Sequence, residues 1–122
     1  MARRDLTGAV DFAYLENYAG GDLVVVEEVL ALFREQASLW VRLLEPGAPS
    51  QGWRDAVHTL KGSARGIGAN ALGDACEAVE RAAPSAAAPD LDGVRDHLDA
   101  VLSDIAAYVH ELALRSLKSP PA

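Results

Sequence analysis

One predicted helix places a nucleophile beside positive charge, because it carries His58, Lys61 and Gly62 on one face. Successive residues of an α-helix are turned by about 100°, so residues three and four positions apart are neighbours on its surface. Arg54 and Arg65 fall on the same side. Neutral imidazole is a nucleophile at physiological pH, and nearby cations stabilise an anion that forms beside it. The pattern predicts a histidine that another molecule can reach.

The opposite side of this helix is apolar. Its inward positions are Trp53, Val57, Leu60, Ala64 and Ile67. Such a stripe packs against a core, so we expect His58 to point outward. Glycine inside a helix is about 1 kcal/mol less favourable than alanine. Gly62 beside His58 therefore indicates either room for an approaching partner or close packing of a neighbouring helix.

A longer motif surrounds the histidine. The run from His58 to Ala69, HTLKGSARGIGA, is followed by Leu72, Cys76 and Glu80 at helical spacing. It resembles the histidine-containing phosphotransfer (HPt) domains of bacterial multistep phosphorelays, and the resemblance extends more loosely over most of the chain. It implies that His58 accepts a phosphoryl group from an aspartyl phosphate on a receiver domain and then passes it on or returns it.

The resemblance also implies roles for the neighbours of His58. Lys61 would stabilise the phosphoryl group, and Gly62 and Arg65 would lie where the partner docks. The alternative for Lys61 and Arg65 is an ordinary solvated helix face. Many HPt domains have a polar residue, often glutamine, that hydrogen-bonds the histidine from the position of Glu80. A carboxylate there can orient the imidazole by accepting its N–H, but it also repels an incoming phosphate.

The composition is that of a small acidic protein. The chain has 122 residues, the size of one domain, and its 11 Lys and Arg against 18 Asp and Glu give a net charge of −7. That balance leaves no broad basic surface for nucleic acid. No apolar run is long enough to span a bilayer, and no signal peptide is evident. We therefore expect a cytoplasmic protein that binds neither nucleic acid nor membranes.

The cysteine and the other histidines do not suggest a metal site. Cys76 is the single cysteine, which excludes a disulfide or a thiolate cluster within one chain. It is in phase with Leu72, which predicts a core position. His97 and His110 are thirteen residues apart and have no metal-ligand spacing. We predict that the chain binds no metal.

Caps and apolar periodicity predict five helices. A short one follows Asp11 and ends at Gly20-Gly21, and a long one follows Asp22 and ends near Leu44. Ser50 and Asn70 are the predicted caps of two more, and the last helix is predicted to start near Asp90. Segments 46–49 and 84–89 are predicted loops, and Gly66 or Gly68 is expected in the left-handed conformation. Besides the positions already named, the predicted inward residues are Phe12, Leu15, Tyr18, Val26, Leu30, Phe33, Ala37, Trp40, Val79, Val94, Leu98, Val101, Leu102, Ile105, Tyr108 and Leu112.

These helices predict an all-α fold. Four amphipathic helices joined by short connections form an up-down-up-down four-helix bundle, with the short helix added at the N-terminus. We expect one HPt-like domain over residues 1–122, with a core over about residues 10–116 and a short flexible tail over 117–122.

The predicted function is that of a phosphorelay intermediate and monomer. Its partners would be a response-regulator receiver and the receiver of a hybrid histidine kinase, and the Mg²⁺ would be bound by the receiver, so this chain would need no cofactor. No glycine-rich nucleotide loop is present, so we predict no kinase activity of its own. The alternative is an adaptor with the same fold that docks on a receiver or kinase without phosphotransfer. A small hydrolase on a helical bundle is a remote third.

Overall fold

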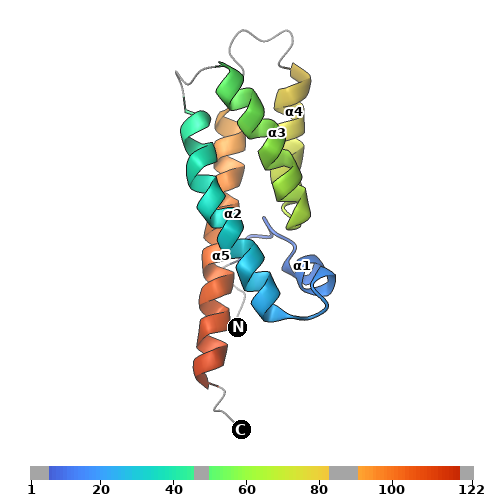
Figure 1. Ribbon diagram of the computed structural model, residues 1–122, viewed down its shortest axis with the longest axis vertical. Helices are drawn as coiled ribbons and strands as arrows, with labels where there is room; N and C mark the ends of the chain where they lie inside the picture. Colours follow the sequence, from blue (N-terminus) through green and yellow to red (C-terminus); the bar gives the residue numbers. More distant parts are fainter. Residues whose placement is uncertain (1–5, 46–49, 83–90, 119–122) are drawn as a thin grey trace.

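Four long helices run alternately up and down, and a short fifth crosses their lower end (Figure 1). The computed structural model describes residues 6–45, 50–82 and 91–118. Within these ranges it contains helices and no strand: α1 (Phe12–Tyr18), α2 (Leu23–Leu43), α3 (Ser50–Gly66), α4 (Asn70–Ala82) and α5 (Asp92–Lys118). The predicted all-α, up-down-up-down bundle with an additional N-terminal helix is confirmed. The predicted loops over 46–49 and 84–89 lie outside the described residues.

Two of the predicted caps close the first helices. The Asp11 carboxylate accepts from the backbone N–H of Tyr14 at 3.0 Å, and that of Asp22 accepts from Val24 and Val25 at 3.0 and 3.3 Å. Each satisfies N–H groups that have no partner inside the helix.

The start predicted near Asp90 is confirmed, since α5 begins at Asp92. The cap predicted at Ser50 adjoins residues 46–49, which lie outside the described part. Asn70 is wrong as a cap, because it is the first residue of α4. Ala69 precedes α4, donates its N–H to Ala64 O at 2.8 Å and accepts from Gly73 N at 3.1 Å. Backbone hydrogen bonds of the tight α3–α4 turn therefore take the place of an asparagine cap.

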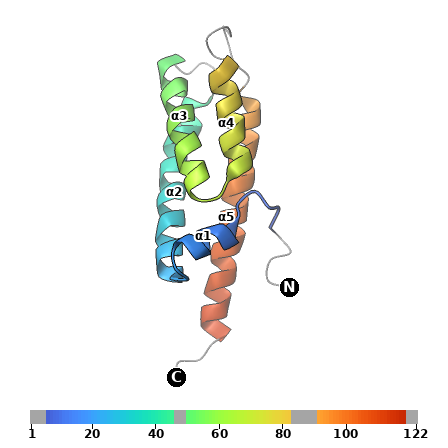
Figure 2. The same cartoon turned by 90° about the vertical axis from the view of Figure 1, so that its right-hand side faces the viewer.

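Of the two glycines considered for this turn, Gly68 has the left-handed backbone, with φ +86°. A Cβ at Gly68 would lie 2.9 Å from the carbonyl oxygen of Asp11, and the Gly68 carbonyl accepts from Asp11 N at 3.0 Å. The glycine thus lets the start of α1 approach the α3–α4 turn closely. Figure 2 shows α1 lying across this end of the hairpin.

The core contains nearly all of the predicted inward side chains. Each of the four long helices contributes a stripe of buried side chains, and α1 and the segment before it add Val10, Phe12 and Leu15. Tyr18 is a wrong prediction, because it is 80% exposed; the seven-residue α1 is anchored by Phe12 and Leu15, and its last turn projects past the core. Leu102 is only partly buried. Phe12 stacks on Tyr108 with ring centroids 4.1 Å apart.

A buried carboxylate fastens the N-terminal segment to the last helix. Asp104 on α5 is fully buried and accepts from Thr7 N, Thr7 Oγ1 and Ala9 N at 3.0 to 3.1 Å. The sequence did not predict the contact between Thr7 and Asp104, because the two residues are 97 positions apart. The packed segment therefore begins before residue 10, the predicted start of the core.

The last helix is longer than expected. It continues to Lys118, two residues into the predicted tail, and residues 119–122 lie outside the described part. Its lower half extends past the α3–α4 hairpin beside α1 and the first turns of α2 (Figures 1 and 2). None of the helices in the described ranges combines the length and apolar composition needed to cross a membrane.

Candidate functional site

The imidazole of His58 projects from the middle of α3 into solvent. Its side chain is 73% exposed, whereas Val57, Leu60 and Ala64 on the other side of the helix are fully buried. The amphipathic pattern of the helix thus determines the direction of the histidine: burying the apolar stripe turns His58 outward.

Glu80 on α4 reaches both of the key side chains of α3. One carboxylate oxygen, Oε2, lies 2.9 Å from His58 Nδ1, and the other, Oε1, lies 2.6 Å from Lys61 Nζ. The lysine and the glutamate are largely sheltered, with side chains 23% and 27% exposed. The candidate site is therefore a chain of three groups, in which a single carboxylate bridges imidazole and ammonium.

The charge on Glu80 determines which imidazole nitrogen carries a proton. The ion pair with Lys61 lowers the pKa of Glu80 most; partial burial works in the opposite direction, and the contact with His58 lowers the pKa further. An ionised carboxylate only accepts hydrogen bonds, so Nδ1 must be the donor. In the neutral ring, Nε2 then keeps its lone pair and is the nucleophilic nitrogen.

Gly62 leaves an open space next to the histidine. A Cβ built at this position would meet no atom within 4 Å, and the backbone needs no left-handed φ. Close packing of a neighbouring helix therefore does not explain the glycine. What remains is a bare patch of helix surface, one turn along α3 from His58.

These features point to a known family. The family model of the Hpt domain matches residues 24–112, most of the chain. The chain belongs to the Hpt family. It is also similar to the crystal structure of the histidine phosphotransferase ShpA from Caulobacter crescentus: the identity is 62%, the match covers 90% of this chain and 99% of that one, and the TM-score is 0.81. A search of curated proteins found no match. Membership supports a role as a phosphorelay carrier.

Arg65 of this Hpt chain contacts α4, as His58 and Lys61 do. Its guanidinium lies 3.3 Å from Asp74 and 3.6 Å from Glu77, both on α4, and its aliphatic stem covers Gly73, where a Cβ would lie 2.8 Å from Arg65 Cγ. Arg65 therefore links α3 to α4. Sequence reasoning missed Gly73, although a glycine inside a helix was a usable signal.

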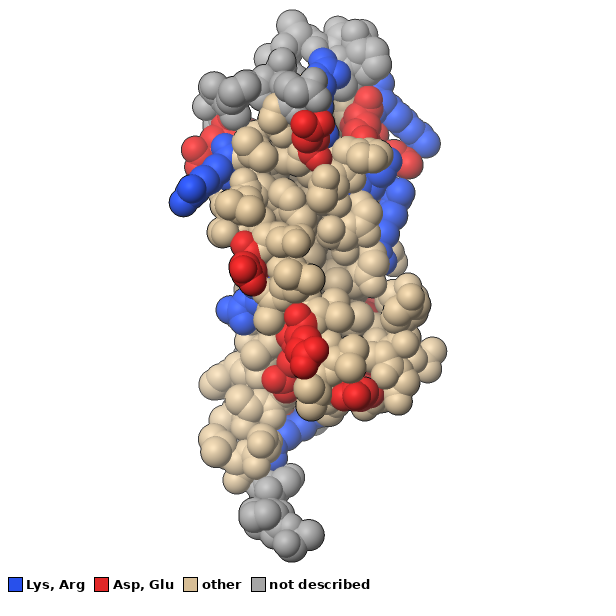
Figure 3. Space-filling view, viewed as in Figure 1, with Lys and Arg blue, Asp and Glu red and all other residues tan. Residues whose placement is uncertain are grey.

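Sequence reasoning also missed an exposed apolar surface of the Hpt chain. Val25, Val29, Leu32 and Leu39 on α2 are exposed. A shallow groove of about 230 Å³ lies beside them, lined by Val29, Leu32, Phe33, Gln36, Ser63, Gly66 and Ile67. The centre of this α2–α3 face is largely uncharged, and basic side chains lie along its α4 edge (Figure 3). The signal was present, since the apolar arc of α2 is wider than one core stripe requires.

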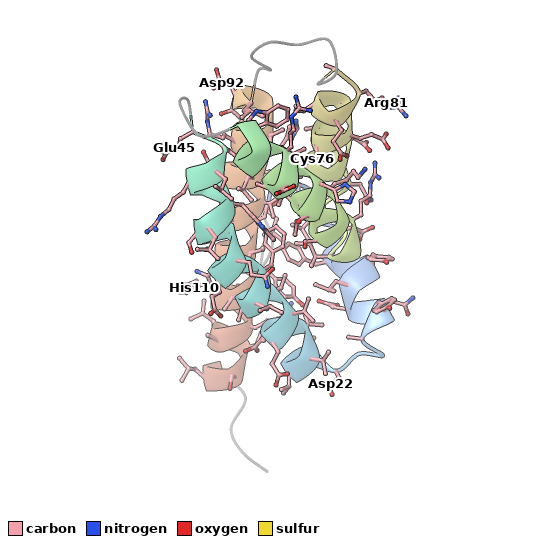
Figure 4. All side chains as sticks on the ribbon, turned by 45° about the horizontal axis from the view of Figure 1, so that its top comes forward. Asp22, Glu45, Cys76, Arg81, Asp92 and His110 are labelled. Atoms are coloured by element: carbon pink, nitrogen blue, oxygen red, sulfur yellow. The ribbon has the colours of Figure 1, made fainter. Side chains whose placement is uncertain are left out.

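The other residues with reactive side chains are Cys76 on α4 and two histidines on α5. Cys76 is fully buried, as predicted, and burial raises the pKa of its thiol to about 11, with Glu80 adding to the rise. His97 and His110 are exposed on α5, and His110 projects from the side of the bundle opposite Arg81 on α4 (Figure 4). In the described ranges, no three His, Cys, Asp or Glu side chains are grouped closely enough to hold a metal ion.

Proposed function

We propose that His58 carries a phosphoryl group between receiver domains. The Nε2 lone pair attacks the phosphorus of an aspartyl phosphate on a response-regulator receiver, the N–P bond forms, and the P–O bond breaks to release the aspartate carboxylate. The positive charge of the phosphorylated ring is shared with Glu80 through the Nδ1 proton. Onward or return transfer to a receiver reverses these steps. The observation that carries this proposal is an exposed imidazole whose Nδ1 meets Glu80 at 2.9 Å.

Lys61 and Glu80 have distinct roles in the proposal. Glu80 is a positioning residue that presents Nε2 to the partner. Lys61, one turn along the same helix, supplies a positive charge for the phosphoryl group. The Mg²⁺ of the reaction is expected on the receiver, so the proposed transfer needs no metal or nucleotide bound by this chain.

The receiver is proposed to dock on the α2–α3 face. The open position at Gly62 adjoins the groove formed by Ser63 and Gly66 with Val29 and Leu32, so an apolar helix of the partner can lie there while its aspartyl phosphate meets His58. Arg65 lies at the α4 edge of this area and can contribute to docking, although its ion pairs with α4 account for its position without a partner.

One observation favours an adaptor instead. The Glu80 carboxylate contacts the imidazole directly and repels a dianion approaching the ring. An adaptor would bind the receiver through the same α2–α3 face but take no phosphoryl group.

Incubation with phosphorylated receivers distinguishes the two. Receivers from the source genome, labelled with ³²P by their kinases, are mixed with the chain and with its His58→Gln variant. The proposal expects acid-labile, base-stable label on the parental chain and none on the variant. Binding of a receiver without any label would favour the adaptor. Label from ATP without a kinase would contradict the proposed absence of kinase activity.

A further inference from the structure

We propose that Glu80 makes this Hpt chain a readier phosphoryl donor, because its carboxylate competes with the phosphoryl group on His58 for the ammonium of Lys61. This inference rests on the proposed phosphotransfer at His58. It starts from the 2.6 Å ion pair between Lys61 and Glu80, which exists before any phosphoryl group arrives.

The charge balance of the site changes on phosphorylation. In the unphosphorylated chain, the ammonium of Lys61 faces the carboxylate of Glu80. Phosphorylation adds a dianionic group on Nε2 and a positive charge on the ring, which stays hydrogen-bonded to Glu80 through Nδ1. Lys61 then has two anionic neighbours, the carboxylate and the phosphoryl group. Lys61 turns to the phosphoryl group, and Glu80 loses its ion pair. The ion pair therefore stabilises the unphosphorylated state relative to the phosphorylated one.

Other cations of α3 and α4 already have partners. Arg65 is paired with Asp74 and Glu77, Arg81 lies 3.4 Å from Glu77, and the guanidinium of Arg54 lies over the Trp53 ring, 4.9 Å from its centroid. Glu80 contacts His58 and Lys61, and it forms no ion pair with these three arginines of α3 and α4. Lys61 is therefore the cation whose choice of partner determines how stable phosphohistidine is.

A glutamine at position 80 would separate the two roles of the carboxylate. Its amide oxygen still accepts the Nδ1 proton and keeps the ring oriented, but without a charge it no longer holds Lys61. Glu80→Gln should therefore shift the transfer equilibrium with a receiver toward the phosphorylated Hpt chain by roughly two- to fivefold, the range expected for one partly exposed ion pair.

The decisive measurement is a double-mutant cycle. The equilibrium constant for transfer from a phosphorylated receiver is measured for the parental chain, Glu80→Gln, Lys61→Ala and the double variant, with Glu28→Gln on the exposed face of α2 as the matched change in net charge. Competition for Lys61 predicts that Glu80→Gln shifts the equilibrium only when Lys61 is present. An equal or larger shift in the Lys61→Ala background would mean direct repulsion by Glu80 and would overturn the proposal.

A receiver-free arm keeps this inference separable from the proposed function. Phosphoramidate is used to phosphorylate His58 chemically, and the ¹⁵N and ¹H signals of the Lys61 ammonium are followed by NMR, together with the imidazole ¹⁵N shifts that report the tautomer. Movement of the Lys61 signal on phosphorylation, with the same tautomer in the parental and Glu80→Gln chains, supports the exchange. An unmoved Lys61 signal overturns it. If no receiver labels the chain, the proposed function fails, and this arm still decides whether Lys61 changes partner.

Discussion

Two carboxylates bridge neighbouring segments of this Hpt chain, and they do so in opposite ways. Asp104 is fully buried and accepts from neutral donors, two backbone N–H groups and a hydroxyl. Glu80 is 27% exposed and bridges an ammonium and an imidazole that can itself gain charge. A buried carboxylate whose donors are fixed in the backbone holds one structure, because losing them would leave it desolvated and unpaired. A partly solvated carboxylate with mobile, charged partners can exchange them at low cost.

The largest expected effect on function comes from substituting His58. His58→Gln removes the nucleophile but no buried contact, so we expect loss of all phosphoryl label. The free energy of unfolding should change by no more than about 0.5 kcal/mol, as for other surface substitutions. Labelling assays and thermal melting of the same preparation measure both. Label that persists in this variant, or that disappears only in His97 or His110 variants, would place the phosphoacceptor elsewhere.

Substituting the buried carboxylate, Asp104, should lower the stability of the fold and leave phosphotransfer nearly unchanged. Asp104→Ala removes the acceptor for the Thr7 and Ala9 N–H groups, and we expect a loss of about 2–3 kcal/mol in the free energy of unfolding, or roughly 10 °C in melting temperature. Transfer at a temperature where the variant is folded should remain near the parental rate. Asp99→Ala, an exposed position on the same helix, is the control. Equal melting of the two variants would show that the buried carboxylate contributes little.

Gly62 sharpens the contrast between fold and site. Gly62→Gln fills the open space beside His58 and replaces the residue with poor helix propensity, so stability should be kept or rise by up to about 1 kcal/mol. Transfer should slow by roughly tenfold or more, because the added side chain keeps the receiver's phosphoryl group away from the imidazole. Gly93→Gln on α5, another position with no neighbour near a built Cβ, is the matched control. A parental transfer rate would remove Gly62 from the docking surface.

The smallest expected effect is the pH dependence of Glu80. Its pKa in the folded chain lies below the ordinary value of 4.5, chiefly because of Lys61. The carboxylate therefore contributes stability above pH 4.5, and this contribution disappears as the pH falls through the lowered pKa. We expect the difference in unfolding free energy between the parental chain and Glu80→Gln to be under about 1 kcal/mol at neutral pH and to shrink in acid. A difference that grows below pH 4.5 would contradict this sign.

Local patterns predicted much of the architecture. The apolar stripes identified the core faces of the four long helices, and Asp11 and Asp22 were identified as caps. The same periodicity turned His58 outward, and Gly62 was correctly placed on the exposed surface. These features depend on residues within one or two helical turns of each other, whose relative directions follow from helix geometry alone. The prediction that Tyr18 faces inward was wrong, because a short helix can end before its last apolar residue reaches the core.

The pairings between helices were decided by the tertiary structure. Glu80 was considered as a partner of His58, 22 residues away, but its ion pair with Lys61 and the hold of α4 on Arg65 depend on the register between α3 and α4. The link from Asp104 to Thr7 spans 97 residues and depends on where the chain before α1 crosses α5. Helical phase defines the face on which a side chain lies, whereas its partner depends on how whole helices pack, to which every core contact contributes.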